Sequence, residues 1–97
     1  LDELALRARI QARKCLVEEG DYFALLGVAK TATTYDVQRA YSDLRLEFEP
    51  SRILTASTAT FREDVDLILE VLDEAYEILS DQLRRERYRR ALEATPG

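Results

Sequence analysis

Several residue types that commonly carry chemistry are scarce or missing in this 97-residue chain. It contains no histidine, no methionine, no tryptophan and a single cysteine. The lack of histidine removes the most frequent general base and metal ligand. One cysteine can neither form an internal disulfide nor build a zinc cluster. With no glycine-rich phosphate loop either, the composition does not support an enzyme, and we expect no catalytic residue, no metal and no cofactor.

Other absences concern the place where the chain works. No apolar run approaches the roughly 20 residues that a membrane span requires, and no signal peptide is visible. Together with the lone cysteine, this leads us to expect a cytoplasmic protein with no membrane partner. The formal net charge of -5 makes nucleic acid an unlikely partner. Because methionine is absent and residue 1 falls within a predicted helix, we also expect a piece of a longer protein.

The residues that are abundant favour α-helix. Hydrophobic residues make up 46% and charged residues 34% of the chain, with only three glycines and two prolines. This is the composition of a folded, helical domain. No segment shows the alternation that is typical of a strand, so we predict an all-α fold. Apolar residues recur at helical spacing over residues 2–19, 22–26, 33–49, 60–79 and 82–93, with a predicted loop over 51–59.

Capping residues mark the ends of these helices. Gly20 and Gly27 are natural C-terminal stops, while Asp21 and Thr33 are natural N-caps. The sequence Thr-Phe-Arg-Glu at residues 60–63 fits a capping box at the start of the fourth helix. The short connections between helices predict antiparallel neighbours.

Apolar stripes predict how the helices pack. The third and fourth helices each carry a long stripe, and these would face each other in a hairpin. The fourth helix has a second stripe that includes Leu67 and Val71, which we expect the first helix to cover, although a partner-binding surface is the alternative. Cys15 of the first helix is expected to pack as a small apolar residue rather than react as a thiol. The predicted stripe of the first helix is Leu1, Leu4, Ala5, Ala8, Ala12, Cys15 and Leu16.

Four segments, in order along the chain, resemble the J-domain of DnaJ-type co-chaperones. Residues 21–28, Asp-Tyr-Phe-Ala-Leu-Leu-Gly-Val, resemble its opening. Residues 33–50 resemble its second helix running into its signature loop. Residues 74–81, Glu-Ala-Tyr-Glu-Ile-Leu-Ser-Asp, resemble the end of its third helix, and residues 84–88 resemble its fourth.

This resemblance implies a domain organisation. Residues 21–93 would form a J-domain-like antiparallel helical hairpin with short flanking helices. Residues 1–20 would be an extra N-terminal helix, and residues 94–97 a tail. In the family this fold serves a co-chaperone of Hsp70 and carries no enzyme activity of its own.

The signature loop departs from the family. J-domains carry a His-Pro-Asp tripeptide after the second helix, and that tripeptide is implicated in stimulating ATP hydrolysis by Hsp70. Here the corresponding positions are Glu49, Pro50 and Ser51, so only the proline remains. Glu49 and Ser51 either form a new binding site at the tip of the loop or are a signature relaxed after its function was lost. We favour the second interpretation.

The second helix also differs in charge. In typical J-domains its exposed face is basic and meets an acidic surface on Hsp70. Here residues 34–49 carry four acidic side chains against two arginines, and like charges across an interface slow encounter and weaken binding. The resemblance therefore implies that both the trigger and the docking surface for Hsp70 are lost. The charged residues are Asp36, Arg39, Asp43, Arg45, Glu47 and Glu49.

Three functions stay open. The leading hypothesis is a degenerate J-domain that acts as a protein-interaction module and binds another protein or other domains of its parent chain. The first alternative is an atypical Hsp70 co-chaperone with compensating surfaces. The second is anion or nucleic-acid binding by the arginine-rich last helix, for which a salt-bridged surface is the simpler interpretation. The residues assigned to partner contacts are Arg39, Asp43, Glu47, Leu67, Val71, Arg84, Arg85 and Arg87.

Overall fold

The computed structural model describes residues 3–94, and every regular element within that range is helical, which confirms the predicted all-α class. Leu1 of the predicted first-helix stripe and residues 95–97 of the predicted tail lie outside the described residues. The elements are α1 (Glu3–Glu19), α2 (Tyr22–Leu26), α3 (Thr34–Glu47), α4 (Pro50–Ile53), the 3-10 helix η1 (Ala56–Phe61), α5 (Arg62–Leu79) and α6 (Gln82–Ala94).

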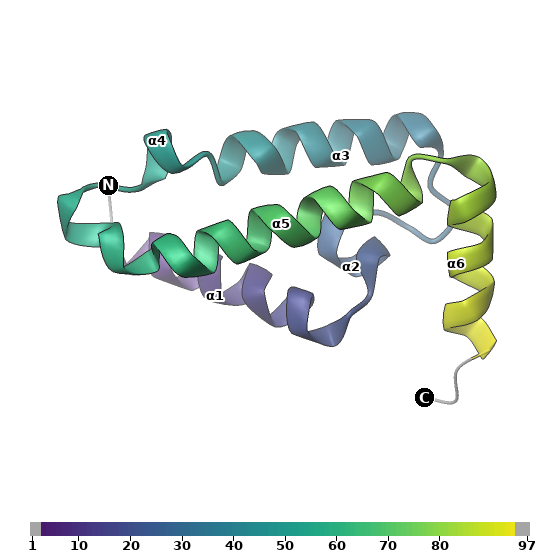
Figure 1. Ribbon diagram of the computed structural model, residues 1–97, viewed down its shortest axis with the longest axis horizontal. Coiled ribbons are helices and arrows are strands. Elements are labelled where there is room, and N and C mark those ends of the chain that lie inside the picture. Colours follow the sequence, from purple (N-terminus) through teal and green to yellow (C-terminus); the bar gives the residue numbers. More distant parts are fainter. Residues whose placement is uncertain (1–2, 95–97) are drawn as a thin grey trace.

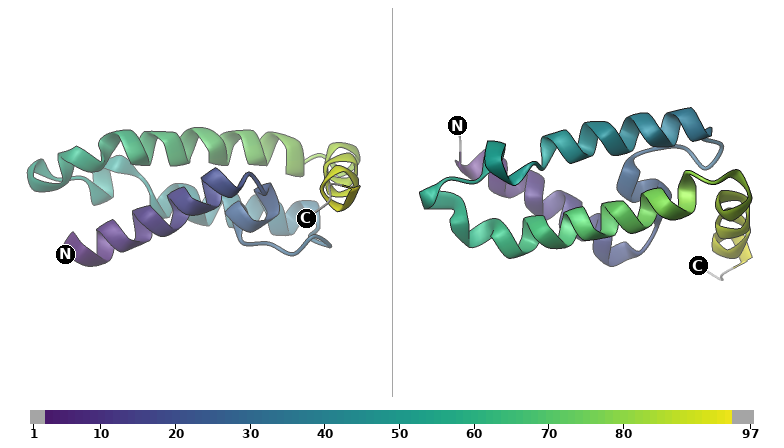
Figure 2. Two further views of the ribbon diagram at one scale, coloured as in Figure 1. Left: turned by 90° about the horizontal axis from the view of Figure 1, so that it is seen from below. Right: turned by 45° about the horizontal axis from the view of Figure 1, so that its top comes forward.

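The two long helices α3 and α5 form the predicted antiparallel hairpin (Figure 1). At one end of the hairpin lie α4 and η1. At the other end, α6 follows the C-terminus of α5 and runs at a steep angle to it. Figure 2 shows α1 running along α5, and in Figure 1 α1 lies below α5 whereas α3 lies above it. Helix α5 contacts α1, α2, α3, α6 and η1, so it is the central element of the domain.

The predicted caps form at the starts of α2 and α3. The Asp21 carboxylate accepts hydrogen bonds from the backbone N–H groups of Phe23 and Ala24, at 2.9 and 3.3 Å. The Thr33 hydroxyl and the Asp36 carboxylate form a reciprocal capping box. Gly27 ends α2 with φ 73°, a left-handed conformation that glycine adopts without strain. These local signals therefore set the boundaries that the sequence predicts.

The core lies between the facing stripes of the hairpin and is closed by α2. Tyr41 of α3 stacks on Tyr76 of α5 with ring centroids 4.2 Å apart. Phe23 of α2 and Phe48 at the end of α3 are the largest fully buried side chains. Each such side chain contributes about 1.5–3 kcal/mol through burial. The other buried residues of these helices are Leu25, Leu26, Val37, Leu44, Val65, Ile68, Leu72, Ala75 and Leu79.

Helix α1 packs against α5 as predicted, but the predicted contact face is wrong. The buried residues of α1 are Leu6 and Ile10, whereas Leu4 is 73% exposed and Cys15 is exposed. The residues on the buried side repeat at helical spacing too, and they carry larger apolar side chains than the alanines opposite, so burying them removes more apolar surface from water. On α5, Leu67 stays 38% exposed and is therefore only partly covered, whereas Val71 is half-buried against the core.

The predicted loop over residues 51–59 contains two short helices, α4 and η1. The capping box predicted at residues 60–63 is not formed, because η1 runs directly into α5 and Phe61 provides no side-chain cap. Instead, the backbone N–H of Thr55 donates to the Thr58 hydroxyl at 2.7 Å. Thr58 and Ile53 are buried, so the connection is anchored to the core rather than free in solvent.

Helix α6 is held to the α1–α2 corner by Tyr88. Its hydroxyl donates to the Gly20 carbonyl and accepts from the backbone N–H of Tyr22, both at 2.9 Å. Its ring stacks on the Tyr22 ring with centroids 5.0 Å apart. The Tyr22 N–H belongs to the first turn of α2, where no carbonyl within the helix can accept it. Leu83, in the first turn of α6, is exposed.

The corrected face of α1 predicts a contrast between two leucines. We expect Leu6→Ala to lower the free energy of unfolding by about 2–5 kcal/mol, because a buried leucine leaves a cavity. Leu4→Ala, the same change on the exposed side of the same helix, should stay within about 0.5 kcal/mol of the parent. Urea denaturation of both variants measures the difference, and equal losses would contradict the assignment of the buried face.

The Tyr88 contacts predict a loss of stability in Tyr88→Phe of about 1–3 kcal/mol, because the Tyr22 N–H loses its acceptor. Tyr35→Phe, at an exposed tyrosine, is the matched control. Burial raises the pKa of Tyr88 in the folded state. The unfolded chain therefore loses this proton first as pH rises, so stability falls above about pH 10. Denaturation between pH 8 and pH 11 should show a smaller decline in Tyr88→Phe than in Tyr35→Phe.

Candidate functional site

The Glu-Pro-Ser sequence at residues 49–51 lies at the tip where α3 ends and α4 begins. Glu49 immediately precedes α4, and Pro50 occupies the first position of α4, where a missing N–H breaks no helical hydrogen bond. The Ser51 hydroxyl donates to Oε1 of Glu49 at 3.3 Å. The two replaced positions therefore interact with each other, and the tip offers neither an imidazole nor a carboxylate at the third position.

A hollow adjoins this tip on the side of η1. Its floor is partly apolar, through Pro50, Leu54 and Ala59, and Arg62 lies at its edge. Arg62 is 4.0 Å from Asp66, one turn further along α5. The full lining is Glu49, Pro50, Ser51, Leu54, Thr55, Ala59 and Arg62.

The structure brings Arg39 and Asp43 together at a second hollow, between α3 and the loop that follows α2. Asp36, which the sequence analysis did not assign to a site, lies there too, two turns before Asp43. Asp36 uses Oδ2 to accept the Thr33 N–H. Within the described residues, Asp43 makes no hydrogen bond or ion pair. The remaining lining is Val28, Ala29, Thr31, Ala32 and Ala40.

Glu47, the second acidic candidate on α3, has a cationic neighbour that sequence reasoning missed. Nε of Arg9 on α1 lies 3.2 Å from Oε2 of Glu47. Both side chains are more than a third exposed, so this ion pair contributes little to stability. It nevertheless reduces the negative charge that α3 presents near its end. No local signal reveals the pair, because 38 residues separate its members.

The other candidates lie elsewhere. Leu67 and Val71 belong to α5, and Arg84, Arg85 and Arg87 belong to α6, at the opposite end of the hairpin from the signature loop (Figure 1). The structure therefore does not gather the predicted residues into one site. It divides them among the α3 face, the loop tip, α5 and α6.

Most arginines of α6 have partners. Arg84 forms an ion pair with Glu77 at 3.4 Å, and Arg85 donates to the Thr34 hydroxyl and to the Leu79 carbonyl at 3.1 and 2.8 Å. Arg85 therefore ties α6 to the ends of both hairpin helices. Arg87 is exposed and has no ion pair within the described residues.

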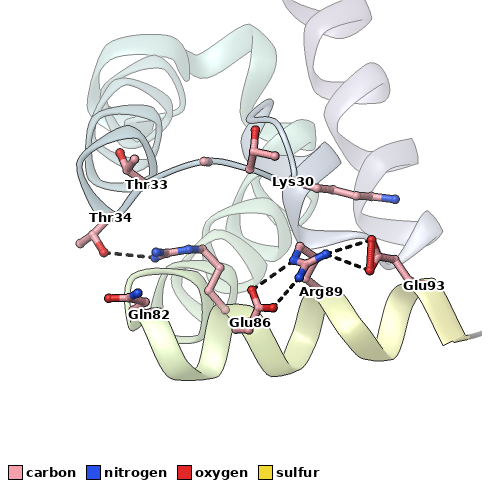
Figure 3. A pocket seen from close by; sticks show the side chains of 10 residues that line it. Lys30, Thr33, Thr34, Gln82, Glu86, Arg89 and Glu93 are labelled. Carbon is pink, nitrogen blue, oxygen red and sulfur yellow. Dashed lines mark hydrogen bonds and ion pairs between the residues drawn. The ribbon is translucent and has the colours of Figure 1, made fainter.

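Arg89 lies between two carboxylates in a hollow beneath the loop at residues 30–34 (Figure 3). It pairs with Glu86 on one side and with Glu93 on the other, and Glu86 also pairs with Arg90 at 3.3 Å. The hydrogen bond from Arg89 lowers the pKa of the Glu86 carboxyl, which keeps that carboxyl ionised. The positive charge of this hollow is therefore largely balanced from within α6.

Within residues 3–94, no group of three or more histidine, cysteine, aspartate or glutamate side chains is placed to hold a metal ion. No helix in this range has the length and apolarity needed to cross a bilayer.

Comparison with known proteins identifies the family. The family model of the DnaJ domain matches residues 21–89, from the cap of α2 to the middle of α6. The chain belongs to the DnaJ domain family. It is 35% identical over 68 residues, 70% of its length, to a chaperone protein DnaJ of Mycoplasma genitalium. It is 33% identical over 88 residues, 91% of its length, to the DnaJ protein P58IPK homolog B of Oryza sativa.

A third relative, a DnaJ homolog subfamily C member 3 homolog of Dictyostelium discoideum, is 32% identical over 80 residues, 82% of the chain. The stretches aligned with this chain span only 15–17% of the length of these three relatives. An aligned stretch of 88 residues in a chain of 97 has to include part of α1, so the likeness to the rice protein extends beyond the family model. No solved structure gives a significant match. J-domain proteins are co-chaperones, so membership of this family supports a co-chaperone role for the domain.

The pairing of the α6 arginines predicts weak binding to nucleic acid. We expect a dissociation constant no tighter than about 1 µM for a random DNA duplex at physiological salt, because phosphate contacts require a continuous basic surface. Fluorescence anisotropy at low and physiological salt measures it, with Arg87→Glu as the matched variant. Submicromolar binding that Arg87→Glu abolishes would contradict this expectation.

Proposed function

We propose that this J-domain is a protein-interaction module of a larger protein and that it does not stimulate ATP hydrolysis by Hsp70. The fold of the family is retained, while the groups that the family uses to act on Hsp70 are replaced. Fold and function are separable here because the replaced side chains lie at the tip and on the surface. None of the three tip residues belongs to the buried core.

The observation that carries the proposal is the chemistry of the tip. The family's tripeptide supplies an imidazole and a carboxylate on either side of the proline. Here the first position is a carboxylate, and its Oε1 accepts the hydroxyl of the third position. At the first position, a ring that can carry a positive charge is thus replaced by a carboxylate. At the third position, a carboxylate is replaced by a neutral hydroxyl that donates a hydrogen bond. No proton or charge that the tripeptide offers to a partner is available in the same place.

The charge of the α3 face supports the same proposal. Asp43 is exposed on this face and lacks a cationic partner within the described residues. An acidic surface on Hsp70 would repel it, and contacts between like charges slow encounter. Binding to Hsp70 has to precede stimulation of ATP hydrolysis, so the acidic α3 face would impair the interaction independently of the residues at the tip.

One contact favours the runner-up, an atypical Hsp70 co-chaperone. Arg9 of α1 lies against Glu47 and offsets the second acidic residue of the face. The face is therefore less acidic in the folded domain than the sequence of α3 alone indicates. Under this alternative, α1 would supply part of the positive charge that the second helix lacks.

A series of three proteins separates the two defects. The first is the parent, the second carries Glu49→His with Ser51→Asp, and the third adds Ser42→Lys with Asp43→Lys. Glu47 is left in place because a lysine there would face Arg9. We expect stimulation only in the third protein, because only there are both trigger and docking charge restored. Single-turnover ATP hydrolysis by an Hsp70, with and without each protein, measures this.

A matched control adds Glu63→Lys with Glu70→Lys to the tripeptide repair. These changes raise the net charge at least as much, but on α5, and they should leave hydrolysis at the basal rate. Stimulation by the parent protein would establish the runner-up instead. Full activity of the tripeptide repair alone would show that the acidic face is no obstacle to docking.

A further inference from the structure

Helix α3 presents two large apolar side chains to solvent. Tyr35 is 65% exposed and Leu46 is 58% exposed. They are eleven residues apart, close to three full turns, so they lie on the same side of the helix, about 16 Å apart along its axis. This side is opposite the buried residues Val37, Leu44 and Phe48, and Arg39 and Ser42 lie between the two apolar side chains. The outward side of α3 is therefore amphipathic rather than uniformly charged.

Beside this stripe lies the hollow that Asp36 and Asp43 border. Its lining includes Val28, Ala32 and Ala40 together with the two carboxylates, so it offers both apolar contact and negative charge. The carboxylates are seven residues apart on α3, which places them two turns, about 10 Å, from each other. One cationic side chain therefore does not contact both carboxylates at once. Two cationic side chains that lie two turns apart on another helix can each contact one of them.

These carboxylates differ from the acidic residues of α5. Several of those are engaged within the domain: Asp73 accepts the Tyr41 hydroxyl, Glu77 pairs with Arg84, and Asp64 pairs with Lys14. Asp43 has no such partner within residues 3–94, and the capping bond of Asp36 uses only its Oδ2. Arg39 lines the same hollow and offsets part of this charge, which leaves a net negative charge beside the apolar stripe of α3.

We propose that this α3 face, formed by Tyr35, Leu46 and the hollow bordered by Asp36 and Asp43, binds a basic amphipathic helix of a partner protein. Charge complementarity selects the partner: lysine or arginine residues two turns apart meet the two carboxylates. Their aliphatic stems lie over Ala32 and Ala40, and apolar residues of the partner cover Leu46 and Tyr35. The proposal rests on the proposed function as an interaction module and names the partner class of that module.

The test uses the full chain and a defined probe. The probe is an 18-residue alanine-based helical peptide with two lysines seven residues apart and two leucines on the neighbouring face. A control peptide has the same composition but its lysines lie five residues apart, on opposite sides. We expect the probe to bind and to shift the backbone amide NMR signals of residues 28–47. The control peptide should bind more weakly, because only one of its lysines reaches a carboxylate.

Matched variants separate this face from general charge attraction. We expect Asp43→Lys to weaken binding of the probe by roughly tenfold, because it replaces an attraction by a repulsion. Glu70→Lys makes the same charge change on an exposed site of α5 and should weaken binding by less than about twofold. Leu46→Ala should weaken binding by about fivefold, whereas Leu83→Ala, at an equally exposed leucine of α6, should leave it unchanged. Circular dichroism verifies that each variant is folded.

Three results would overturn the proposal: no binding of the probe, signal shifts centred on α5 or α6, or equal losses in Asp43→Lys and Glu70→Lys. None of these readouts involves Hsp70. They leave the proposed function as it stands, and only stimulated ATP hydrolysis by the parent protein overturns that. The two failures are therefore distinguishable.

Discussion

The burial of α5 is the constraint on which the rest of the domain depends. This helix places five residues entirely in the core and contacts α1, α2, α3, α6 and η1. The other elements meet largely by way of it: α3 supplies the opposite half of the hairpin, α2 closes one end, and α1 covers a further side. A small domain has little apolar surface to bury, so the surrounding helices bury most of theirs against one shared helix.

Polar contacts fix the ends of the hairpin, where little apolar surface is available for packing. The Tyr88 hydroxyl accepts a hydrogen bond from the first backbone N–H of α2 and donates one to the Gly20 carbonyl just after α1. The Arg85 guanidinium donates hydrogen bonds to the first residue of α3 and to the last residue of α5. These contacts orient α6, which buries no residue of its own. Arg85 and Tyr88 therefore link α6 to the ends of the neighbouring helices.

The same arrangement explains how the residues at the tip can vary while the fold is kept. Phe48 and Ile53 anchor the chain on either side of the tip, and both are buried. Glu49 and Ser51 project from a short turn between these anchors and contact each other rather than the core. Their identities are therefore free to change without loss of packing. What changes is the chemistry offered to a partner.

The sequence by itself determined the helical class, the family, the hairpin and the caps at Asp21 and Thr33, because capping and apolar periodicity are local properties of the chain. It also located the altered tripeptide. Tertiary structure alone decided which side of α1 is buried, since that helix carries two competing periodic stripes and the larger side chains at Leu6 and Ile10 pack best against α5. It also decided that Arg9 meets Glu47 and that Asp36 joins Asp43 beside a hollow. Such contacts either join residues that are distant in the chain or depend on which element packs against a helix. A local sequence pattern predicts neither.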